Sequence, residues 1–200
     1  KCGQFAPPAA ESGKTVLVGG AGPAGLSAAY HLRRMGHGVT LREAGPLAGG
    51  MMRFGIPKYR LPRHIIDAEV KRITNMGVTL HLDSKVADIE QEMIAGGYDA
   101  AFLAVGAHIA KRAYIPAAGA AKVLDAVQLL RSMEGEAPPL LGRKVVVYGG
   151  GNTAIDVART ARRLGAEEAI IVYRRTREKM PAHDFEVEEA LEEGVSMKWL

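Results

Sequence analysis

A predicted strand, a glycine-rich turn and a predicted helix follow one another near the start of this 200-residue sequence. The apolar, β-branched run Thr15–Gly19 leads into the turn, whose spaced glycines are Gly20, Gly22 and Gly25. Glycines at this spacing permit a tight turn, let the backbone approach a pyrophosphate and let helix and strand pack closely. Free N–H groups at the start of the helix then face the anion. The pattern predicts a dinucleotide-binding unit, and the alternative is a plain glycine-rich turn between a strand and a helix.

Glu43 stands where such a unit usually contacts a ribose. It follows the next predicted strand, Val39–Arg42, about 20 residues after the first glycine of the turn, where the ribose hydroxyls need an acceptor. A carboxylate accepts hydrogen bonds from a ribose diol and repels a 2′-phosphate. We therefore expect the first unit to hold an adenosine with a free 2′-hydroxyl, as in FAD.

The same pattern returns in the last third of the sequence. A second predicted strand ends in a turn that carries Gly149, Gly151 and, at the third spaced position, Ala154. The strand that follows ends at Arg174 and Arg175 rather than at an acid. Two guanidinium groups bind a phosphate through bidentate, charge-assisted hydrogen bonds. We expect the second unit to hold an adenosine that carries a 2′-phosphate, as in NADPH, and the alternative is a pair of surface arginines.

These two patterns predict an α/β fold with two Rossmann-like dinucleotide-binding units. We expect an N-terminal linker over residues 1–14, the first segment of an FAD-binding domain over 15–133, a linker over 134–142 and an NADPH-binding domain over 143–200. A doubly wound domain normally needs more strands than the last range supplies, so the chain reads as truncated or as completed by a partner. The apolar run Tyr98–Gly106 predicts a parallel strand that is buried on both faces.

The segment Gly49–Pro62 combines aromatic residues, prolines and basic residues without helical or strand periodicity. Long irregular segments inside compact domains are usually functional or disordered, and this segment is too apolar for disorder. We expect its backbone near Gly49, Gly50 and Met51 to lie flat against a planar ring system. The alternative is a surface loop whose aromatic residues cover the core.

The composition excludes several classes of function. The single cysteine, Cys2, supplies neither an internal disulfide framework nor the redox cysteine pair of a disulfide reductase, and it fits a reducing, cytoplasmic compartment. The net charge of +4 is modest, and the basic cluster Arg174–Lys179 is too short and too mixed with acids to indicate nucleic acid binding. No stretch is long and apolar enough to insert into a membrane.

Several motifs together resemble a known family. The segments Val18–Gly25, Gly49–Pro62, Gly149–Arg159 and Tyr173–Ala182 resemble the small (beta) subunit of NADPH-dependent glutamate synthase. The chain is similar, more distantly, to adrenodoxin reductase and to the flavin–NADPH part of dihydropyrimidine dehydrogenase. The resemblance runs from about Thr15 to the end of the sequence. In that family the FAD domain comes in two segments, with the NADPH domain inserted between them.

The resemblance implies a role for each matching residue. Residues that hold the FAD diphosphate and ribose would be Gly20, Gly22, Ala24, Gly25 and Glu43. Residues near the flavin or the adenine would be Gly50, Met51, Arg53, Val86 and Gly106. Residues that hold NADPH would be Gly149, Gly151, Asn152, Thr153, Arg174 and Arg175. Many members have Thr-Gly where this chain has Val105-Gly106, which leaves the flavin contacts there open.

The implied activity is hydride transfer from NADPH to FAD, followed by electron transfer to an iron–sulfur or flavin partner such as a large catalytic subunit. The step needs no protein acid, base or nucleophile, so we predict no catalytic side chain and no metal site. Iron–sulfur clusters would belong to missing or partner segments. The alternatives are an electron-input subunit for a different acceptor enzyme, an amine oxidase, and a nucleotide-binding module without turnover.

Overall fold

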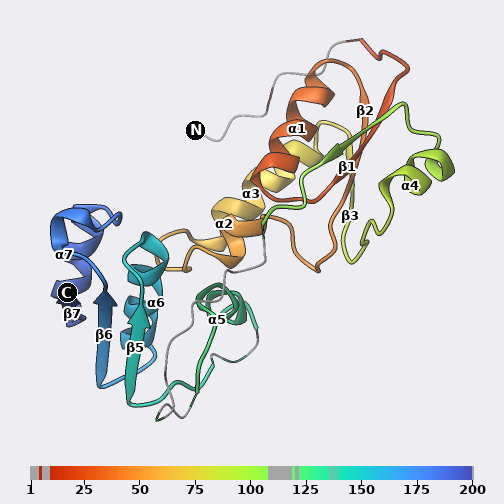
Figure 1. Ribbon diagram of the computed structural model, residues 1–200. Coiled ribbons are helices and arrows are strands. Elements are labelled where there is room, and N and C mark those ends of the chain that lie inside the picture. Colours follow the sequence, from red (N-terminus) through yellow and green to blue (C-terminus); the bar gives the residue numbers. More distant parts are fainter. Residues whose placement is uncertain are drawn as a thin grey trace. The chain divides into compact units, whose positions relative to one another are not determined.

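The computed structural model describes residues 5, 10–107, 119, 122–135, 137 and 139–199. The chain divides into two compact units, the first formed by Lys1–Arg53 with Lys58–His108 and the second by Phe54–Pro57 with Ile109–Leu200 (Figure 1). Cys2 and much of the predicted linker 1–14 lie outside the described residues. Among the described residues, none of the helices has the length and apolar character needed to cross a bilayer.

The first unit is a parallel sheet with helices. Its strands are β1 (Thr15–Gly19), β2 (Gly38–Arg42), β3 (Val78–His81) and β4 (Ala100–Leu103). Its helices are α1 (Pro23–Arg34), α2 (Gly50–Phe54), α3 (Arg63–Thr74) and α4 (Ile89–Gly96). The strand order is β3-β2-β1-β4, so the order reverses at β1. In open α/β sheets this reversal opens a crevice at the carboxyl end of the central strands, where ligands bind.

The core of the first unit forms between α1 and the central strands. Val18 of β1 and Leu41 of β2 are fully buried, and they belong to the same cluster as Leu26 and Ala29 of α1. Leu26 and Ala29 are three residues apart and therefore lie on one face of the helix. Helix α1 also contacts α3 (Figure 1). This packing fixes the direction in which the start of α1 points.

Strand β4 differs from the expectation for Tyr98–Gly106. The strand covers only Ala100–Leu103 and is not buried, because the side chains of Phe102 and Leu103 are 44% and 61% exposed. Among the described residues β4 pairs only with β1, at the edge of the sheet. The prediction of a strand covered on both faces is therefore wrong here. An apolar run indicates a strand but does not say which neighbours cover it.

The second unit is also parallel. Its strands are β5 (Lys144–Tyr148), β6 (Glu168–Tyr173) and β7 (Ser196–Trp199), in the order β5-β6-β7. Its helices are α5 (Ala126–Ser132), α6 (Asn152–Arg163), the short 3₁₀ helix η1 (Arg177–Lys179) and α7 (Asp184–Glu192). Helix α6 packs on β5 and β6 and contacts both α5 and α7 (Figure 1).

The core of the second unit includes Ile155 and Ala158 of α6, Ile171 of β6 and also Leu129 and Leu130 of α5. Helix α5 therefore packs with the second unit. The division of the chain into nucleotide domains at residues 134–142 stays a prediction, because such domains are defined by what they bind.

The sequence analysis predicted no helix at α2 or α4, and α2 lies in the segment Gly49–Pro62, which was expected to be irregular. Helix α4 begins after Asp88, whose Oδ1 accepts hydrogen bonds from the backbone N–H groups of Glu90 at 3.0 Å and Gln91 at 3.1 Å. It ends at Gly97 in the left-handed conformation. Helix α2, Gly50–Phe54, is a single turn, too short for its apolar residues to show a helical period. The capping residues Asp88 and Gly97 could have predicted α4 from the sequence. The five residues of α2 offer no comparable signal.

An ion-pair network joins α6 to α7. The guanidinium of Arg159 has a side-chain exposure of only 6% and pairs with Glu189 at 2.6 Å and with Glu193 at 2.7 Å. Arg163 also pairs with Glu193, at 2.6 Å. Burial alone raises the pKa of Glu193, but the hydrogen bonds from Arg163 and Arg159 outweigh it and hold the pKa at about 2.

Substituting Glu193→Gln is expected to lower the free energy of unfolding by about 1–3 kcal/mol at neutral pH, because the buried Arg159 loses a charged partner. The native pKa lies below the ordinary value of 4.5. The contribution of Glu193 is therefore complete above that value and is lost as the pH falls toward 2. Urea unfolding at several pH values measures it. The exposed Glu192→Gln is the control, and an equal loss in both variants would contradict the network.

Candidate dinucleotide-binding sites

The first glycine turn lies at the reversal point of the first sheet. Gly20 has a φ of +107°, and a Cβ there would overlap the carbonyl oxygen of Ala104, the residue after β4. A Cβ on Gly25 would overlap the carbonyl oxygen of Gly20. Both glycines are therefore required by the turn itself. Gly106, with a φ of +72°, follows β4 near the same edge of the sheet.

Gly22 lies in more open surroundings and close to Gly50. The nearest atom to a Cβ on Gly22 would be the Cα of Gly50, at 3.7 Å. Gly50 itself has a φ of +50°, and a Cβ there would lie 2.6 Å from the Cα of Gly22. The N–H of Gly49 donates to the carbonyl oxygen of Ala21 at 2.8 Å. The structure thus brings the predicted site residue Gly50 to the first turn.

The start of α1 offers free donors beside this turn. The first residues of a helix have no carbonyl one turn earlier to accept from their N–H groups. In α1 the first internal bond runs from Leu26 N–H to Gly22 O at 2.9 Å, which leaves the N–H groups of Ala24 and Gly25 as open donors. Space at Gly22 and donors at the helix start fit a diphosphate.

Glu43 is fixed by two backbone donors. Its Oε2 accepts from the N–H of Ala21 at 2.8 Å, and its Oε1 accepts from the N–H of Gly45 at 2.9 Å. The first bond ties the carboxylate to the glycine turn. Each carboxylate oxygen has a further lone pair, so the group can still accept a hydroxyl donor. Its position and remaining acceptors fit a ribose diol.

The segment before Val86 is hydrogen-bonded to the loop that contains Glu43 and Gly45. The N–H of Ser84 donates to the carbonyl oxygen of Glu43 at 2.7 Å, and the N–H of Asp83 donates to that of Gly45 at 3.0 Å. Arg42 adds a bond from its Nε to the hydroxyl of Ser84 at 2.8 Å. The half-buried Val86 therefore follows a segment held beside Glu43.

Arg53 and Met51 have different surroundings. The side chain of Arg53 is buried, its Nε donates to the carbonyl oxygen of Ala48 at 2.6 Å, and its Nη2 forms an ion pair with Asp67. These bonds hold Arg53 beneath the loop that precedes Gly50. Met51 is 37% exposed at the start of α2. Arg53 thus supports the loop, whereas Met51 lies on the surface.

The second glycine turn, like the first, bonds to the neighbouring strand and leaves space at its second spaced glycine. It differs at Gly150, which lies against the ring of Tyr173. The N–H of Gly149 donates to the carbonyl oxygen of Val172 in β6 at 3.1 Å, and nothing lies within 4 Å of a Cβ built on Gly151. A Cβ on Gly150 would lie 2.5 Å from the ring of Tyr173. Gly150 therefore leaves room for this ring. The space at Gly151 fits a diphosphate, as at Gly22.

The start of α6 also has open donors, but the side chain of Asn152 is engaged. Both Ala154 and Ile155 donate to the carbonyl oxygen of Gly151, at 2.8 and 3.3 Å, so the N–H groups of Asn152 and Thr153 have no partner inside the helix. The Oδ1 of Asn152 accepts from the N–H of His183 at 3.2 Å. The side chain of Asn152 thus holds the loop before α7, and its backbone faces the turn.

The two predicted phosphate ligands, Arg174 and Arg175, are both exposed directly after β6. Because β5 and β6 are parallel, this end of β6 lies at the same edge of the sheet as the glycine turn. The hydroxyl of Tyr173 donates to the carbonyl oxygen of Lys179 at 2.8 Å. This bond closes the loop that carries both arginines.

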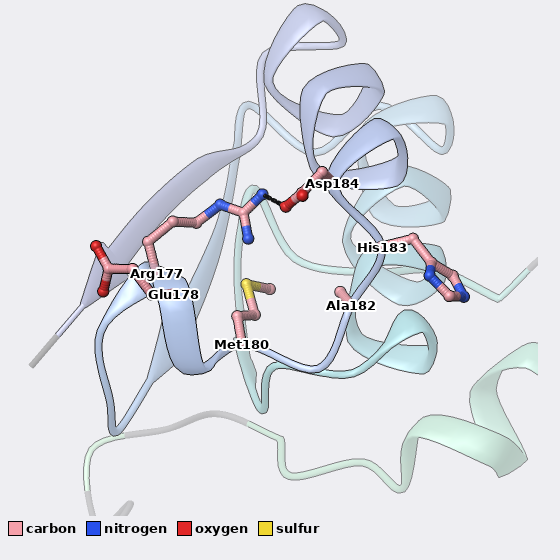
Figure 2. Close-up of a pocket in the computed structure, with 6 residues that line it drawn as sticks. All are labelled: Arg177, Glu178, Met180, Ala182, His183 and Asp184. Atoms are coloured by element: carbon pink, nitrogen blue, oxygen red, sulfur yellow. Dashed lines mark hydrogen bonds and ion pairs between the residues drawn. The ribbon is translucent and has the colours of Figure 1, made fainter.

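Sequence reasoning missed an open cavity of about 490 Å³ beside the second turn. Figure 2 shows its lining, which comes from η1, the following loop and the start of α7: Arg177, Glu178, Met180, Ala182, His183 and Asp184. The only signal was the Tyr173–Ala182 motif, which matched the family without assigning these residues a role.

Comparison with known proteins places this geometry in a family. The family model described as pyridine nucleotide-disulphide oxidoreductase matches residues 14–199. This chain belongs to that oxidoreductase family. The match covers both glycine turns, and the single cysteine of the 200 residues supplies no cysteine pair.

Two curated relatives illustrate the similarity. The chain is 45% identical over 196 residues to the NADP(+)-dependent formate dehydrogenase subunit beta of Moorella thermoacetica, covering 96% of this chain and 28% of that protein. It is 36% identical over 201 residues to the glutamate synthase [NADPH] small chain of Escherichia coli, covering 94% and 43%. The chain therefore spans less than half the length of these relatives. The resemblance to glutamate synthase small subunits is confirmed.

A solved structure agrees with the family assignment at the level of the fold. FprA from Mycobacterium tuberculosis, in complex with NADPH, has a TM-score of 0.73 at 22% identity, over 90% of this chain and 47% of FprA. The α/β, Rossmann-like fold predicted for the sequence is therefore confirmed.

The two glycines Gly25 and Gly22 should differ sharply when replaced by alanine. Gly25→Ala forces a Cβ into the carbonyl oxygen of Gly20 and is expected to lower the free energy of unfolding by more than about 2 kcal/mol. Gly22→Ala meets only ordinary contacts and should change it by less than about 1 kcal/mol. Urea unfolding of both variants measures the difference, and equal losses would contradict the geometry.

Proposed function

We propose that this chain is the FAD- and NADPH-binding part of an electron-transfer oxidoreductase of the glutamate synthase small-subunit type. The observation that carries the proposal is the contrast between the two ribose positions. The first strand pair ends in Glu43, a carboxylate held on the glycine turn, and the second ends in the exposed Arg174 and Arg175.

The contrast supports a different nucleotide for each unit. Glu43 accepts from hydroxyl groups and repels a 2′-phosphate, which suits the adenosine of FAD. Arg174 and Arg175 supply planar guanidinium groups that match phosphate oxygens in pairs, which suits NADPH over NADH. Gly22 and Gly151 leave space for a diphosphate in each unit. No side chain is assigned an acid–base role.

The residues of the chain bind and orient the two nucleotides, and the bound cofactors supply hydride transfer from nicotinamide C4 to flavin N5. Diphosphates would lie at the starts of α1 and α6, where the helix N–H groups donate. Val86 would contact the adenine of FAD, and Gly50, Met51 and Gly106 would border the flavin. Arg53 would act by holding the loop before Gly50.

The names of two relatives describe subunits of larger enzymes, which supports a partner subunit for this chain. One is the small chain of an NADPH-dependent glutamate synthase, and another is the beta subunit of an NADP(+)-dependent formate dehydrogenase. We propose that electrons pass to such a subunit in a cytoplasmic complex, through iron–sulfur clusters that missing or partner segments would hold. The second name favours an alternative, an electron-input subunit for an acceptor other than glutamate synthase.

Rapid mixing of the flavin-loaded protein with NADPH or NADH tests the proposal. We expect NADPH to bleach the flavin absorbance quickly and NADH to do so slowly. If both nucleotides bind without bleaching the flavin, the protein is a nucleotide-binding module without turnover. Identifying the electron acceptor that co-purifies with the intact protein distinguishes a glutamate synthase partner from another enzyme.

Replacing Arg174 and Arg175 together by Gln should weaken NADPH binding by about 2–4 kcal/mol, because charged hydrogen bonds to the 2′-phosphate are lost. NADH binding should remain nearly unchanged. Titration of the flavin-loaded protein with each nucleotide measures both affinities. The control removes the same charge at the opposite end of β5, by Arg143→Gln with Lys144→Gln. Equal losses for NADPH and NADH would refute a 2′-phosphate contact.

A further inference from the structure

The ring of Phe5 contacts two helices of the first unit. Its centre lies 4.6 Å from the ring centre of Tyr30 in α1 and 4.0 Å from the guanidinium carbon of Arg72 in α3. The side chain is half-buried and packs against the core of the unit. One aromatic residue near the start of the sequence therefore links α1 to α3.

The contact with Phe5 matters for Arg72 because part of its guanidinium is buried. The Nη1 of Arg72 donates to Glu69 at 2.7 Å, whereas its Nε is buried and has no hydrogen-bond partner among the described residues. A buried donor without a partner is costly, and a cation over an aromatic face gains electrostatic energy that grows as water is excluded. The ring of Phe5 therefore offsets part of the cost of burying Arg72.

A second anchor binds the N-terminal stretch to the end of α1. Glu11 forms an ion pair with Arg33, whose side chain is only 11% exposed, and the hydrogen bond from Arg33 lowers the pKa of Glu11. The N–H of Ser12 donates to the carbonyl oxygen of Gly36 at 2.9 Å. These bonds do not involve the ring of Phe5, so they remain when that ring is removed.

Helix α3 is held by few buried side chains of its own. Of its 12 residues only Ile66 and Ile73 are buried, so the contact of Phe5 with Arg72 contributes to the position of the helix. Asp67 lies five residues before Arg72, about 7.5 Å along the helix axis. A shift of α3 at Arg72 therefore also moves Asp67.

The same helix supports the loop that precedes Gly50. A Cβ on Gly49 would lie 2.9 Å from the Cγ2 of Ile66, so the loop rests directly on α3. Asp67 forms an ion pair with Arg53, and the Nε of Arg53 donates to a carbonyl oxygen of this loop at 2.6 Å. The position of α3 thus determines how closely Gly50 approaches the first glycine turn.

We propose that Phe5 is a positioning residue for the flavin site. It fixes α3 against α1, and α3 in turn holds the backbone of Gly49 and Gly50 at the first glycine turn. The inference rests on the proposed function where it concerns FAD, because this loop borders the proposed flavin site. The position of the loop itself does not require a bound cofactor, so it can be measured separately.

Titration of the intact protein with FAD, after removal of bound flavin, measures the effect on the cofactor. Phe5→Ala should weaken FAD binding by about threefold, because the loop is no longer held in place. Phe5→Tyr keeps an aromatic face over Arg72 and should restore the affinity. Binding of 2′,5′-ADP, which tests the second unit, should not change in either variant.

Hydrogen exchange without FAD measures the loop directly. The N–H of Gly49 donates to the carbonyl oxygen of Ala21 at 2.8 Å and exchanges when the loop opens. Phe5→Ala should speed this exchange by about threefold. The matched control is Asp99→Asn, which removes the carboxylate that pairs with Lys14 at the start of β1, and it should change neither Gly49 exchange nor FAD affinity.

The outcomes distinguish this inference from the function on which it rests. Equal effects of Phe5→Ala and Asp99→Asn at Gly49 would show a general loss of stability and overturn the inference, as would failure of Phe5→Tyr to restore FAD affinity. If the unsubstituted protein binds FAD and Phe5→Ala changes neither readout, the inference fails and the proposed function stands. If the unsubstituted protein binds no FAD while Phe5→Ala still speeds exchange at Gly49, the proposed function fails and Phe5 still positions the loop.

Discussion

The close approach of backbone to backbone at Gly20 and Gly25 is the constraint on which the first unit depends. Neither position has room for a Cβ, because Gly25 lies against the carbonyl of Gly20 and Gly20 lies against that of Ala104. The contact joins β1, α1 and the end of β4 at one point. With the helix so close, its free N–H groups face the carboxyl edge of the sheet, and Glu43 reaches the turn through Ala21. The geometry of the whole site follows from this contact.

Both units fix the far end of the helix that follows their glycine turn in the same way. Arg33 near the end of α1 donates from its Nε to the carbonyl oxygen of Met76 at 2.8 Å, and Gly77 lies beside its guanidinium. In the second unit Arg162 donates from its Nε to the carbonyl oxygen of Glu193 at 3.3 Å, and Gly194 lies beside it. Each arginine stands at the same spacing from the first glycine of its turn. The second unit therefore repeats the first both in its glycine turn and at the end of the helix that follows the turn.

The sequence predicted the features that depend on local backbone requirements. Strand, glycine turn and helix are recognisable because each glycine has a steric reason, and the positions of Glu43 and Arg174 follow from strand length. Features set by neighbours were not predictable in the same way. The apolar run in β4 did not reveal an exposed edge, and α2 is too short for a period.

The hydrogen-bond partners of side chains could not be predicted from the sequence either. The family resemblance implied a place for Arg53 near a flavin, but nothing in the sequence pairs it with Ala48 and Asp67. The amide of Asn152 likewise binds the backbone of His183, a residue from a distant loop. Such contacts depend on tertiary structure, whereas the identity of a turn glycine depends on its own φ angle.

The loop between β6 and α7 is anchored largely through main-chain atoms, since Ala182, His183 and Lys179 all use backbone groups in their bonds to the turn and to Tyr173. Main-chain anchors survive replacement of the side chains they carry. The solvent-facing positions of the loop are thus free to mutate while its path is preserved. If the second unit binds NADPH as proposed, a lineage with this architecture can change its coenzyme preference in small steps, without rebuilding the glycine turn.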